Sequence, residues 1–224
     1  SVIMSGGDKD HVVYTHKGVG STTDAFGSGT PTGYYIRKFS HRQLAGNWFV
    51  GTSQAFDLIR YAEILLNYAE ALNEVEGSYE IPSWNGETMY TITRSATALK
   101  EGIQPIRIRA GLPDYEVYDD VKKFRFKVKR ERQIELFAEG HRFFDIRRWC
   151  DAPVEEALPI YGCNIYLTSE NPDSFHTPIE VTSLPTMFTT KMWFWPIHHN
   201  IMKRNMWMIQ NPGWKDPELS LIHI

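Results

Sequence analysis

The sequence has 224 residues, 42% of them hydrophobic and 23% charged, which is enough to enclose a core in one large domain or two small ones. This composition excludes a wholly disordered chain and a multi-span membrane protein. The 27 acidic and 24 basic residues give a formal net charge of −3, which argues against a polyanionic partner such as nucleic acid.

The N-terminal quarter is predicted to lack long helices. Residues 1–56 are rich in Gly, Ser and Thr, which indicates loops and short extended segments. A helix is then expected over residues 57–76, because apolar side chains recur there at steps of three and four residues. Gly77 follows directly and is predicted to be the left-handed residue that ends this helix.

A loop and a second helix come next. Turn-forming residues predict a loop over residues 78–92. Ser95 can cap a helix that is expected to run to Ala110 and to end at Gly111. Pro105 lacks a backbone donor, so it is expected to kink or split this helix.

The third predicted helix begins at Asp119 or Asp120, either of which can be its N-cap, and extends to Trp149. Gly140 lies inside this span and costs ~1 kcal/mol relative to Ala in a helix interior, so a bend or break is expected there. A basic run over residues 122–132 predicts a solvated helix face rather than a nucleic-acid-binding stripe.

The C-terminal third is expected to be mostly irregular, because prolines punctuate residues 151–190. Residues 192–195 have the composition of a strand, and a short helix is predicted near residues 199–204. The two cysteines, Cys150 and Cys163, are too few for a disulfide scaffold. We expect free thiols, with a single bridge as the alternative.

Helices joined by loops predict a mainly α fold, and tetratricopeptide-like helix pairs suit this pattern. Ala69 and Ala138 are small residues placed where helices must approach one another. No apolar run reaches the ~18 residues that a membrane-spanning helix needs. The sequence also lacks a glycine-rich phosphate loop, a nucleophile elbow and histidines at metal-ligand spacing. We therefore predict no enzyme activity, no metal and no other cofactor.

Three glutamates on one face of the third helix, Glu131, Glu135 and Glu139, are followed by Asp145. Paired carboxylates can perform the acid–base chemistry of glycoside hydrolases. The same face is apolar, however, so we favour buried ion pairs with structural roles. The arginines available to form these pairs are Arg60, Arg107, Arg109 and Arg142.

Five sequence blocks, in order along residues 34–214, resemble the SusD/RagB family of outer-membrane nutrient-binding lipoproteins. The blocks are YYIRKF at residues 34–39, RYAEILLNYAEA at 60–71, IRAGLP at 108–113, KRERQIELFAEGHRFFDIRRW at 129–149, and FWPI at 194–197 with QNPGW at 210–214. The resemblance implies a SusD-like α-helical fold with tetratricopeptide-like helix pairs, long irregular loops and few short strands.

The resemblance also implies a function: non-catalytic binding of oligosaccharide or polysaccharide at the cell surface, and delivery to a SusC-like TonB-dependent transporter. The implied location is the outer membrane, through a lipid anchor that lies outside this chain. Residues 1–218 are expected to form the C-terminal region of such a protein, without its N-terminal helical repeats. Residues 219–224 match a translated sequencing adapter and are expected to be a non-native tail.

The family signature implies a structural ion-pair framework. Its members are Arg60, Glu70, Glu131, Glu135 and Arg142. This implication agrees with the buried ion pairs favoured above for the glutamates of the third helix.

The glycan-binding residues are sought among the aromatic residues, which make up 13% of the chain. Sugars stack on aromatic rings, and loops on a rigid scaffold carry specificity. Rings at helical spacing are assigned to the core: Tyr61, Tyr68, Phe124, Phe137, Phe143, Phe144 and Trp149. Trp195 and Trp214 are assigned to the framework. The rings that remain are Tyr14, Trp48 and Trp84, with Asn47, Asn85, Asp24 and Arg42 as polar partners.

Two alternative functions stay open. A tetratricopeptide-like scaffold that binds a protein or peptide requires an exposed concave helical face. A glycoside hydrolase, the less favoured alternative, requires Glu131, Glu135 or Asp145 to lie in an open cleft with a carboxylate partner.

Overall fold

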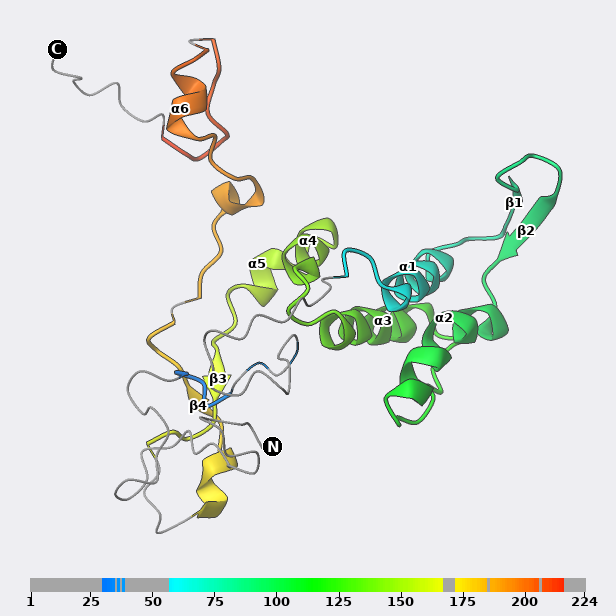
Figure 1. Ribbon diagram of the computed structural model, residues 1–224, viewed down its shortest axis with the longest axis horizontal. Helices are drawn as coiled ribbons and strands as arrows, with labels where there is room; N and C mark the ends of the chain where they lie inside the picture. Colours follow the sequence, from blue (N-terminus) through cyan, green and yellow to red (C-terminus); the bar gives the residue numbers. More distant parts are fainter. Residues whose placement is uncertain are drawn as a thin grey trace, which may run out of the picture. The chain divides into compact units, whose positions relative to one another are not determined.

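The computed structural model describes residues 30–34, 36, 38, 57–166, 172–184, 186–205 and 207–215 (Figure 1). The chain divides into a helical unit, Gln54–Phe144, and a loop-rich unit made of Ser1–Ser53 and Asp145–Ile224. Helices predominate among the elements of the described residues, which confirms the predicted mainly α fold. The tail predicted over residues 219–224 lies outside the described part of the chain.

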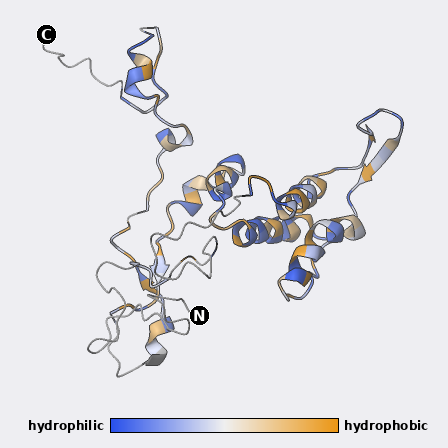
Figure 2. Cartoon of the chain, in the orientation of Figure 1, coloured by the Kyte–Doolittle hydropathy of each residue, from blue (hydrophilic) through white to orange (hydrophobic). Residues whose placement is uncertain are grey.

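Three packed helices form the helical unit: α1 (Tyr61–Asn73), α2 (Ala96–Arg109) and α3 (Val121–Glu135). Helix α1 packs against both α2 and α3. Figure 2 shows hydrophobic and hydrophilic residues alternating along each helix, as expected of helices that bury one face. The largest fully buried apolar side chains are those of Leu66, Leu99, Ile103, Phe124 and Val128.

Small residues determine how closely α1 and α2 approach. Ala69 is fully buried, as predicted for a residue at a helix contact, and it faces Gly102 of α2. A Cβ at position 102 would lie 2.8 Å from both the Ala69 Cβ and the Leu65 carbonyl oxygen. A side chain at this position would therefore force the two helices apart.

Both predicted ends of α2 are confirmed. The Ser95 Oγ accepts a hydrogen bond from a backbone N–H of the first turn at 3.2 Å. Gly111, with φ +68°, ends the helix, and its N–H donates to a carbonyl of the last turn. The helix is not split at Pro105, because the buried side chains of Ile103 and Ile106 hold it in the core on either side.

Helix α1 ends at Asn73, earlier than predicted, and its C-cap is Glu74. Gly77 has φ +79°, but it precedes a strand instead of ending the helix, so the prediction of its role is wrong. Between Asn73 and Gly77 only Val75 is apolar, and although it packs against the core, one apolar residue does not continue the buried face of α1 for another turn.

The loop predicted over residues 78–92 is wrong, because most of this segment is an antiparallel hairpin of β1 (Ser78–Pro82) and β2 (Met89–Thr93). The prediction of a loop rested on turn-forming residues in the middle of the segment, such as Asn85 and Gly86. The residues on either side are β-branched or aromatic at every second position, which favours strands.

The predicted start and break of the third helix are confirmed. Asp120 caps α3, and its carboxylate accepts a hydrogen bond from a backbone N–H at 3.0 Å. Helix α3 ends at Glu135, and α4 (His141–Arg148) begins after Gly140, whose φ is +83°. Ala138 lies exposed between the two helices with φ +63°, so its predicted role at a helix contact is wrong.

Several rings predicted to lie in the core are exposed. Phe124 is fully buried, and Phe143 and Trp149 are half-buried. The exposed rings, for which the core assignment is wrong, are Tyr61, Tyr68, Phe137 and Phe144. The reason is that each helix buries one narrow stripe, and helical spacing alone does not show which stripe faces the neighbouring helices.

The described part of the loop-rich unit contains short elements. They are α5 (Ala152–Glu155), β3 (Tyr161–Gly162) paired with β4 (Ile179–Glu180), the 3₁₀ helices η2 (Pro172–His176) and η3 (Thr190–Trp193), and α6 (His199–Met202). Helix α6 confirms the predicted short helix. The strand predicted over residues 192–195 is wrong, because that segment finishes η3 and pairs with no strand in the described ranges. Cys150 is exposed, Cys163 is buried, and both are free thiols.

Candidate functional site

Two of the predicted glycan-binding residues, Trp84 and Asn85, lie in the turn between β1 and β2. Trp84 is 98% exposed. The other predicted residues lie outside the described residues: Tyr14, Asp24, Arg42, Asn47 and Trp48. The described part of the candidate site is therefore the hairpin and its turn.

Hydrogen bonds within the turn give it a defined shape. The Gly86 N–H donates to the Ser83 carbonyl at 2.9 Å, and Gly86 has φ +73°, a conformation that favours glycine. The Asn85 Oδ1 accepts from the Ser83 hydroxyl at 2.6 Å, and the Asn85 Nδ2 donates to the Glu87 carboxylate at 2.6 Å. Asn85 thus orders the turn, and Trp84 is presented from a structured loop.

The register of the hairpin places four large side chains, two tyrosines and two isoleucines, on one face. Tyr79 lies opposite Ile92, and Ile81 lies opposite Tyr90. Because side chains alternate between the faces of a strand, these four residues share one face. Tyr79, Ile81 and Tyr90 are not among the residues predicted for the site, although their period-two spacing in the sequence is typical of one strand face.

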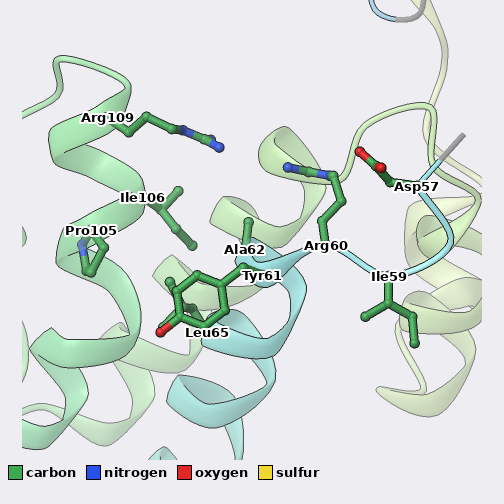
Figure 3. Close-up of a pocket in the computed structure, with 9 residues that line it drawn as sticks. All are labelled: Asp57, Ile59, Arg60, Tyr61, Ala62, Leu65, Pro105, Ile106 and Arg109. Atoms are coloured by element: carbon green, nitrogen blue, oxygen red, sulfur yellow. The ribbon is translucent and has the colours of Figure 1, made fainter. Parts of the chain in front are cut away.

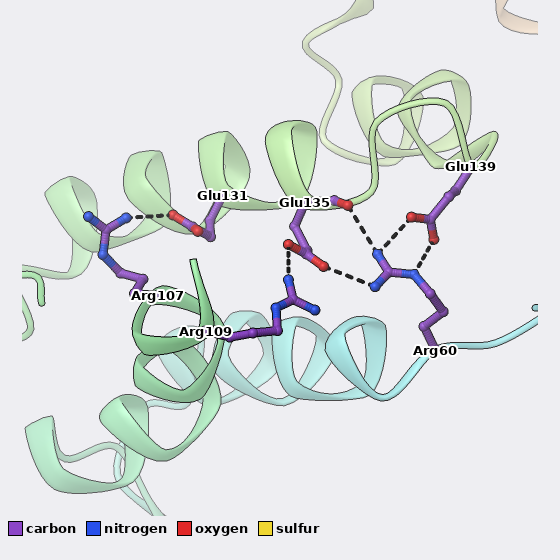
Figure 4. A network of polar contacts seen from close by, with 6 residues as sticks. All are labelled: Arg60, Arg107, Arg109, Glu131, Glu135 and Glu139. Carbon is purple, nitrogen blue, oxygen red and sulfur yellow. Dashed lines mark hydrogen bonds and ion pairs between the residues drawn. The ribbon is translucent and has the colours of Figure 1, made fainter. Parts of the chain in front are cut away.

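A network of arginines and glutamates joins α1 to the segment after α3 (Figure 4). The Arg60 guanidinium donates to both carboxylate oxygens of Glu139, from Nε at 2.8 Å and from Nη2 at 2.6 Å. It also donates to the side chain and the backbone carbonyl of Glu135, each at 3.0 Å. The hydrogen bonds to Glu139 are the largest cause of a raised pKa for Arg60, which stays fully charged.

Arginines of α2 bind the same row of glutamates on α3. The Arg107 Nη1 donates to Glu131 at 2.9 Å, and the Arg109 Nη2 donates to Glu135 at 2.5 Å. The Tyr115 hydroxyl also donates to Glu131, at 2.5 Å. Burial, together with this hydrogen bond to a carboxylate, raises the pKa of Tyr115.

The carboxylates that a glycoside hydrolase would need are engaged by arginines. The Glu131 and Asp145 side chains are each 5% exposed. Glu131 forms an ion pair with Arg107, and Asp145 forms one with Arg148 at 2.8 Å. Glu135 binds two arginines, as described above. A general acid or base must reach a substrate in a cleft. These buried pairs therefore do not support the hydrolase alternative.

The remaining residues of the predicted framework lie in the same unit. Glu70 of α1 is 3.6 Å from the Nε of Arg132, a buried arginine of α3 that also donates to Asn67 at 2.6 Å. Arg142 is half-buried in the first turn of α4. Charged groups thus link α1 to α3 in several places.

A pocket of about 450 Å³ lies between the start of α1 and the end of α2. In Figure 3 the guanidinium groups of Arg60 and Arg109 point toward each other, and Tyr61 and Leu65 lie on another side of the pocket. Glu135 accepts hydrogen bonds from both arginines. The positive charge of this pocket is therefore already compensated, and the pocket does not have the free cations of an anion site.

The described residues contain no group of three or more histidine, cysteine, aspartate or glutamate side chains that could hold a metal ion together. In the same part of the chain, no helix is both long enough and apolar enough to span a bilayer.

Two of the sequence blocks in the loop-rich unit bind each other. The side-chain amide of Gln210 donates to the Ile197 carbonyl at 3.0 Å and accepts from the Ile197 N–H at 2.7 Å. The Asn211 amide donates to the Trp195 carbonyl at 2.6 Å. The Trp214 indole N–H donates to backbone carbonyls of the same region. The QNPGW block thus closes onto the FWPI block.

Comparisons with known proteins agree with the family resemblance of the five sequence blocks. The family model described as the SusD family matches residues 9–214. SusD-like protein P2 of Formosa agariphila is 35% identical over 117 residues, which is 51% of this chain and 21% of that protein.

Two solved structures are similar as well. A SusD-like protein (BF3747) from Bacteroides fragilis has 26% identity and a TM-score of 0.61, over 85% of this chain and 32% of that one. The selenomethionine form of BT4246 has 29% identity and a TM-score of 0.57, over 76% of this chain and 26% of that one. The chain thus spans at most about a third of the length of these relatives.

Proposed function

The chain belongs to the SusD family, and from this membership and the exposed hairpin turn we propose that it binds oligosaccharide or polysaccharide without catalysing its cleavage. The observation that carries the proposal is the 98% exposed ring of Trp84, held by a turn whose own polar groups are hydrogen bonded. An indole that contacts nothing in its own unit is available to stack on a sugar ring.

The proposed glycan-binding residues are the aromatic and amide residues predicted from the sequence. They are Tyr14, Asn47, Trp48, Trp84 and Asn85. Each ring can stack on a sugar, and Trp84 and Asn85 belong to the described turn. Asn85 holds the turn of Trp84 in place, as its hydrogen bonds to Ser83 and Glu87 support.

The proposed partner is a SusC-like TonB-dependent transporter, to which the bound glycan is delivered for import. The proposed location is the outer surface of the outer membrane, through a lipid anchor. Both proposals come from the resemblance and from family membership. The partnership is tested by purifying a tagged form of the protein from solubilised outer membranes. The transporter should copurify with it. Recovery of the tagged protein without any TonB-dependent transporter would contradict the partnership.

The ion pairs that arginines form with Glu131, Glu135 and Asp145 support the proposal of a non-catalytic role. Prolonged incubation with any polysaccharide that the chain binds should release no shorter sugar, as measured by chromatography of the products. The proposal would be contradicted if the unmodified chain released shorter sugars and the Glu131→Gln variant did not.

Glycan binding is tested by affinity electrophoresis of the whole chain in gels that contain starch, xylan, laminarin or galactomannan. We expect retardation by at least one polysaccharide, and weaker retardation of the Trp84→Ala, Trp48→Ala and Tyr14→Ala variants. Phe126→Ala is the matched control, because Phe126 is an exposed ring on α3 outside the proposed site. Equal retardation of all variants would remove these rings from the site.

One observation favours a second function, the binding of a peptide helix. Helix α3 exposes Phe126 and Ile134, and Phe137 is exposed in the turn that follows the helix. A cavity of about 510 Å³ beside Arg130 adjoins Ile134 and Phe137. Such a stripe can accept the apolar face of an amphipathic helix. The test is peptide capture from a random-peptide display library. This function is favoured if the unmodified chain captures peptides and the Ile134→Asp variant does not. Equal capture by the unmodified chain and the variant would exclude it.

A further inference from the structure

The β1–β2 hairpin has one mixed face and one apolar face. The mixed face carries Met89 and a hydrogen bond that Thr91 donates to the Glu80 carboxylate at 2.7 Å. On the other face, Tyr79, Ile81 and Tyr90 are 55%, 49% and 55% exposed. A two-stranded hairpin has no second layer of its own, so nothing within the hairpin covers these side chains.

The hairpin is anchored at its base. Ile92, on the same face as Tyr79, is partly buried and packs against the core of the three helices. Figure 1 shows the hairpin extending beyond the ends of α1 and α2. The anchored end fixes the hairpin, and the outer part of its apolar face stays exposed.

The rings of this face are close enough to act together. Tyr79 lies opposite Ile92, and Tyr90 is two residues before Ile92 on the same strand, so the two tyrosines are diagonal neighbours. Diagonal positions on one face of a strand pair lie about 7–8 Å apart, within reach of aromatic side chains. Trp84, which is 98% exposed, lies in the turn that joins the two strands.

We propose that Tyr79, Tyr90 and Trp84 form a stacking platform for an uncharged polysaccharide, a proposal that rests on the glycan-binding function above. Flat rings on a sheet surface bind the C–H faces of sugars, and the tyrosine hydroxyls supply hydrogen bonds to sugar hydroxyls. Ile81 lies on the same face, opposite Tyr90 and two residues after Tyr79, so it neighbours both tyrosines.

The charge of the hairpin selects an uncharged polymer. Residues 78–93 contain two carboxylates, Glu80 and Glu87, and no lysine or arginine. Arg94 follows at the base, but its guanidinium donates to Asn73 and to the Tyr118 carbonyl. A polymer of uronic acids or sulfated sugars would therefore meet like charge without a cation to bind it.

The experiment measures affinity for starch, xylan, laminarin and galactomannan, each paired with its carboxymethylated form, by calorimetry of the whole chain. Tyr79→Ala and Tyr90→Ala should each weaken binding of the uncharged polymer about tenfold. Tyr90→Phe should retain most of the affinity, because the ring is kept. Carboxymethylation should weaken binding by a similar factor.

Met89→Ala is the matched control. Met89 is also 55% exposed, on the opposite face of the same hairpin, so its removal should leave affinity unchanged. Circular dichroism of each variant checks that the chain is folded.

Each outcome decides between the two proposals. If the unmodified chain binds none of these polymers, the proposed glycan-binding function fails and the platform fails with it. If the chain binds but both tyrosine variants bind equally well, only the platform is overturned. Equal or tighter binding of the carboxymethylated forms would overturn the choice of an uncharged polymer.

Discussion

Arg60, the residue before the first turn of α1, donates two hydrogen bonds to Glu139, which is 79 positions further along the chain. The same guanidinium binds Glu135, so one side chain joins the start of α1 to the end of α3 and to the segment before α4. Bidentate pairing of this kind fixes orientation as well as distance. The RYAEILLNYAEA block and the longest block of the family signature thus meet at Arg60.

Replacement of Arg60 by alanine should lower the free energy of unfolding by about 3 kcal/mol, because two little-exposed carboxylates lose their partner. The Arg60, Glu135 and Glu139 side chains are 22%, 13% and 9% exposed. Urea denaturation measures the change. Lys123→Ala is the control, since Lys123 pairs with Asp120 at the surface and should give no measurable change. Equal stability of both variants would contradict a structural role for Arg60.

Gly102→Ala should destabilise the helical unit although alanine is the better helix former. The added Cβ would lie 2.8 Å from the Ala69 Cβ and from a backbone oxygen of α1. Overpacking costs about 1–3 kcal/mol, more than the ~1 kcal/mol that alanine gains in helix propensity. Thr97→Ala, at an exposed position of the same helix, should be neutral or slightly stabilising in the same urea titration. A stabilised Gly102→Ala variant would show that α1 and α2 are not in close contact.

Tyr115 should make stability fall at alkaline pH. Burial and the hydrogen bond to Glu131 raise its pKa in the folded protein above the usual value of about 10. Its stabilising contribution is therefore complete below pH ~10 and is lost as the pH rises further, because the unfolded chain releases the proton first.

Tyr115→Phe tests this dependence. At pH 7 the variant should be less stable by about 2 kcal/mol, the typical value for a hydrogen bond to a charged group. The difference in the free energy of unfolding between the variant and the unmodified protein should become smaller when the urea titrations are repeated above pH 10. A constant difference across this range would show that Tyr115 ionises equally in both states. The other tyrosines titrate in both proteins and cancel in the comparison.

Gln210→Ala should loosen the contact between the two C-terminal blocks. It removes the partner of both the N–H and the carbonyl of Ile197. We expect about tenfold faster hydrogen exchange at the Ile197 amide, corresponding to a loss of about 1.4 kcal/mol in local protection. Lys203→Ala, at an exposed position after α6, should leave that amide unchanged. Unchanged exchange in Gln210→Ala would mean that the blocks are held by other contacts.

The helices and most of their ends could be predicted from the sequence, because these features depend on nearby residues. The capping side chains of Ser95 and Asp120, the left-handed glycine at position 111 and the break near Gly140 each act within one or two turns. Five ordered sequence blocks were also sufficient to identify the family.

The tertiary structure alone decided which side chains face the core and which partners the charged groups take. Tyr61 and Phe144 have helical spacing but lie outside the buried stripes of their helices, and Arg60 binds glutamates more than 70 residues away. The paired strands around Trp84 also depend on a partner, since a strand is stabilised by cross-strand pairs rather than by its own residues. Local chemistry determines where helices start and stop, whereas burial and pairing are properties of the assembled chain.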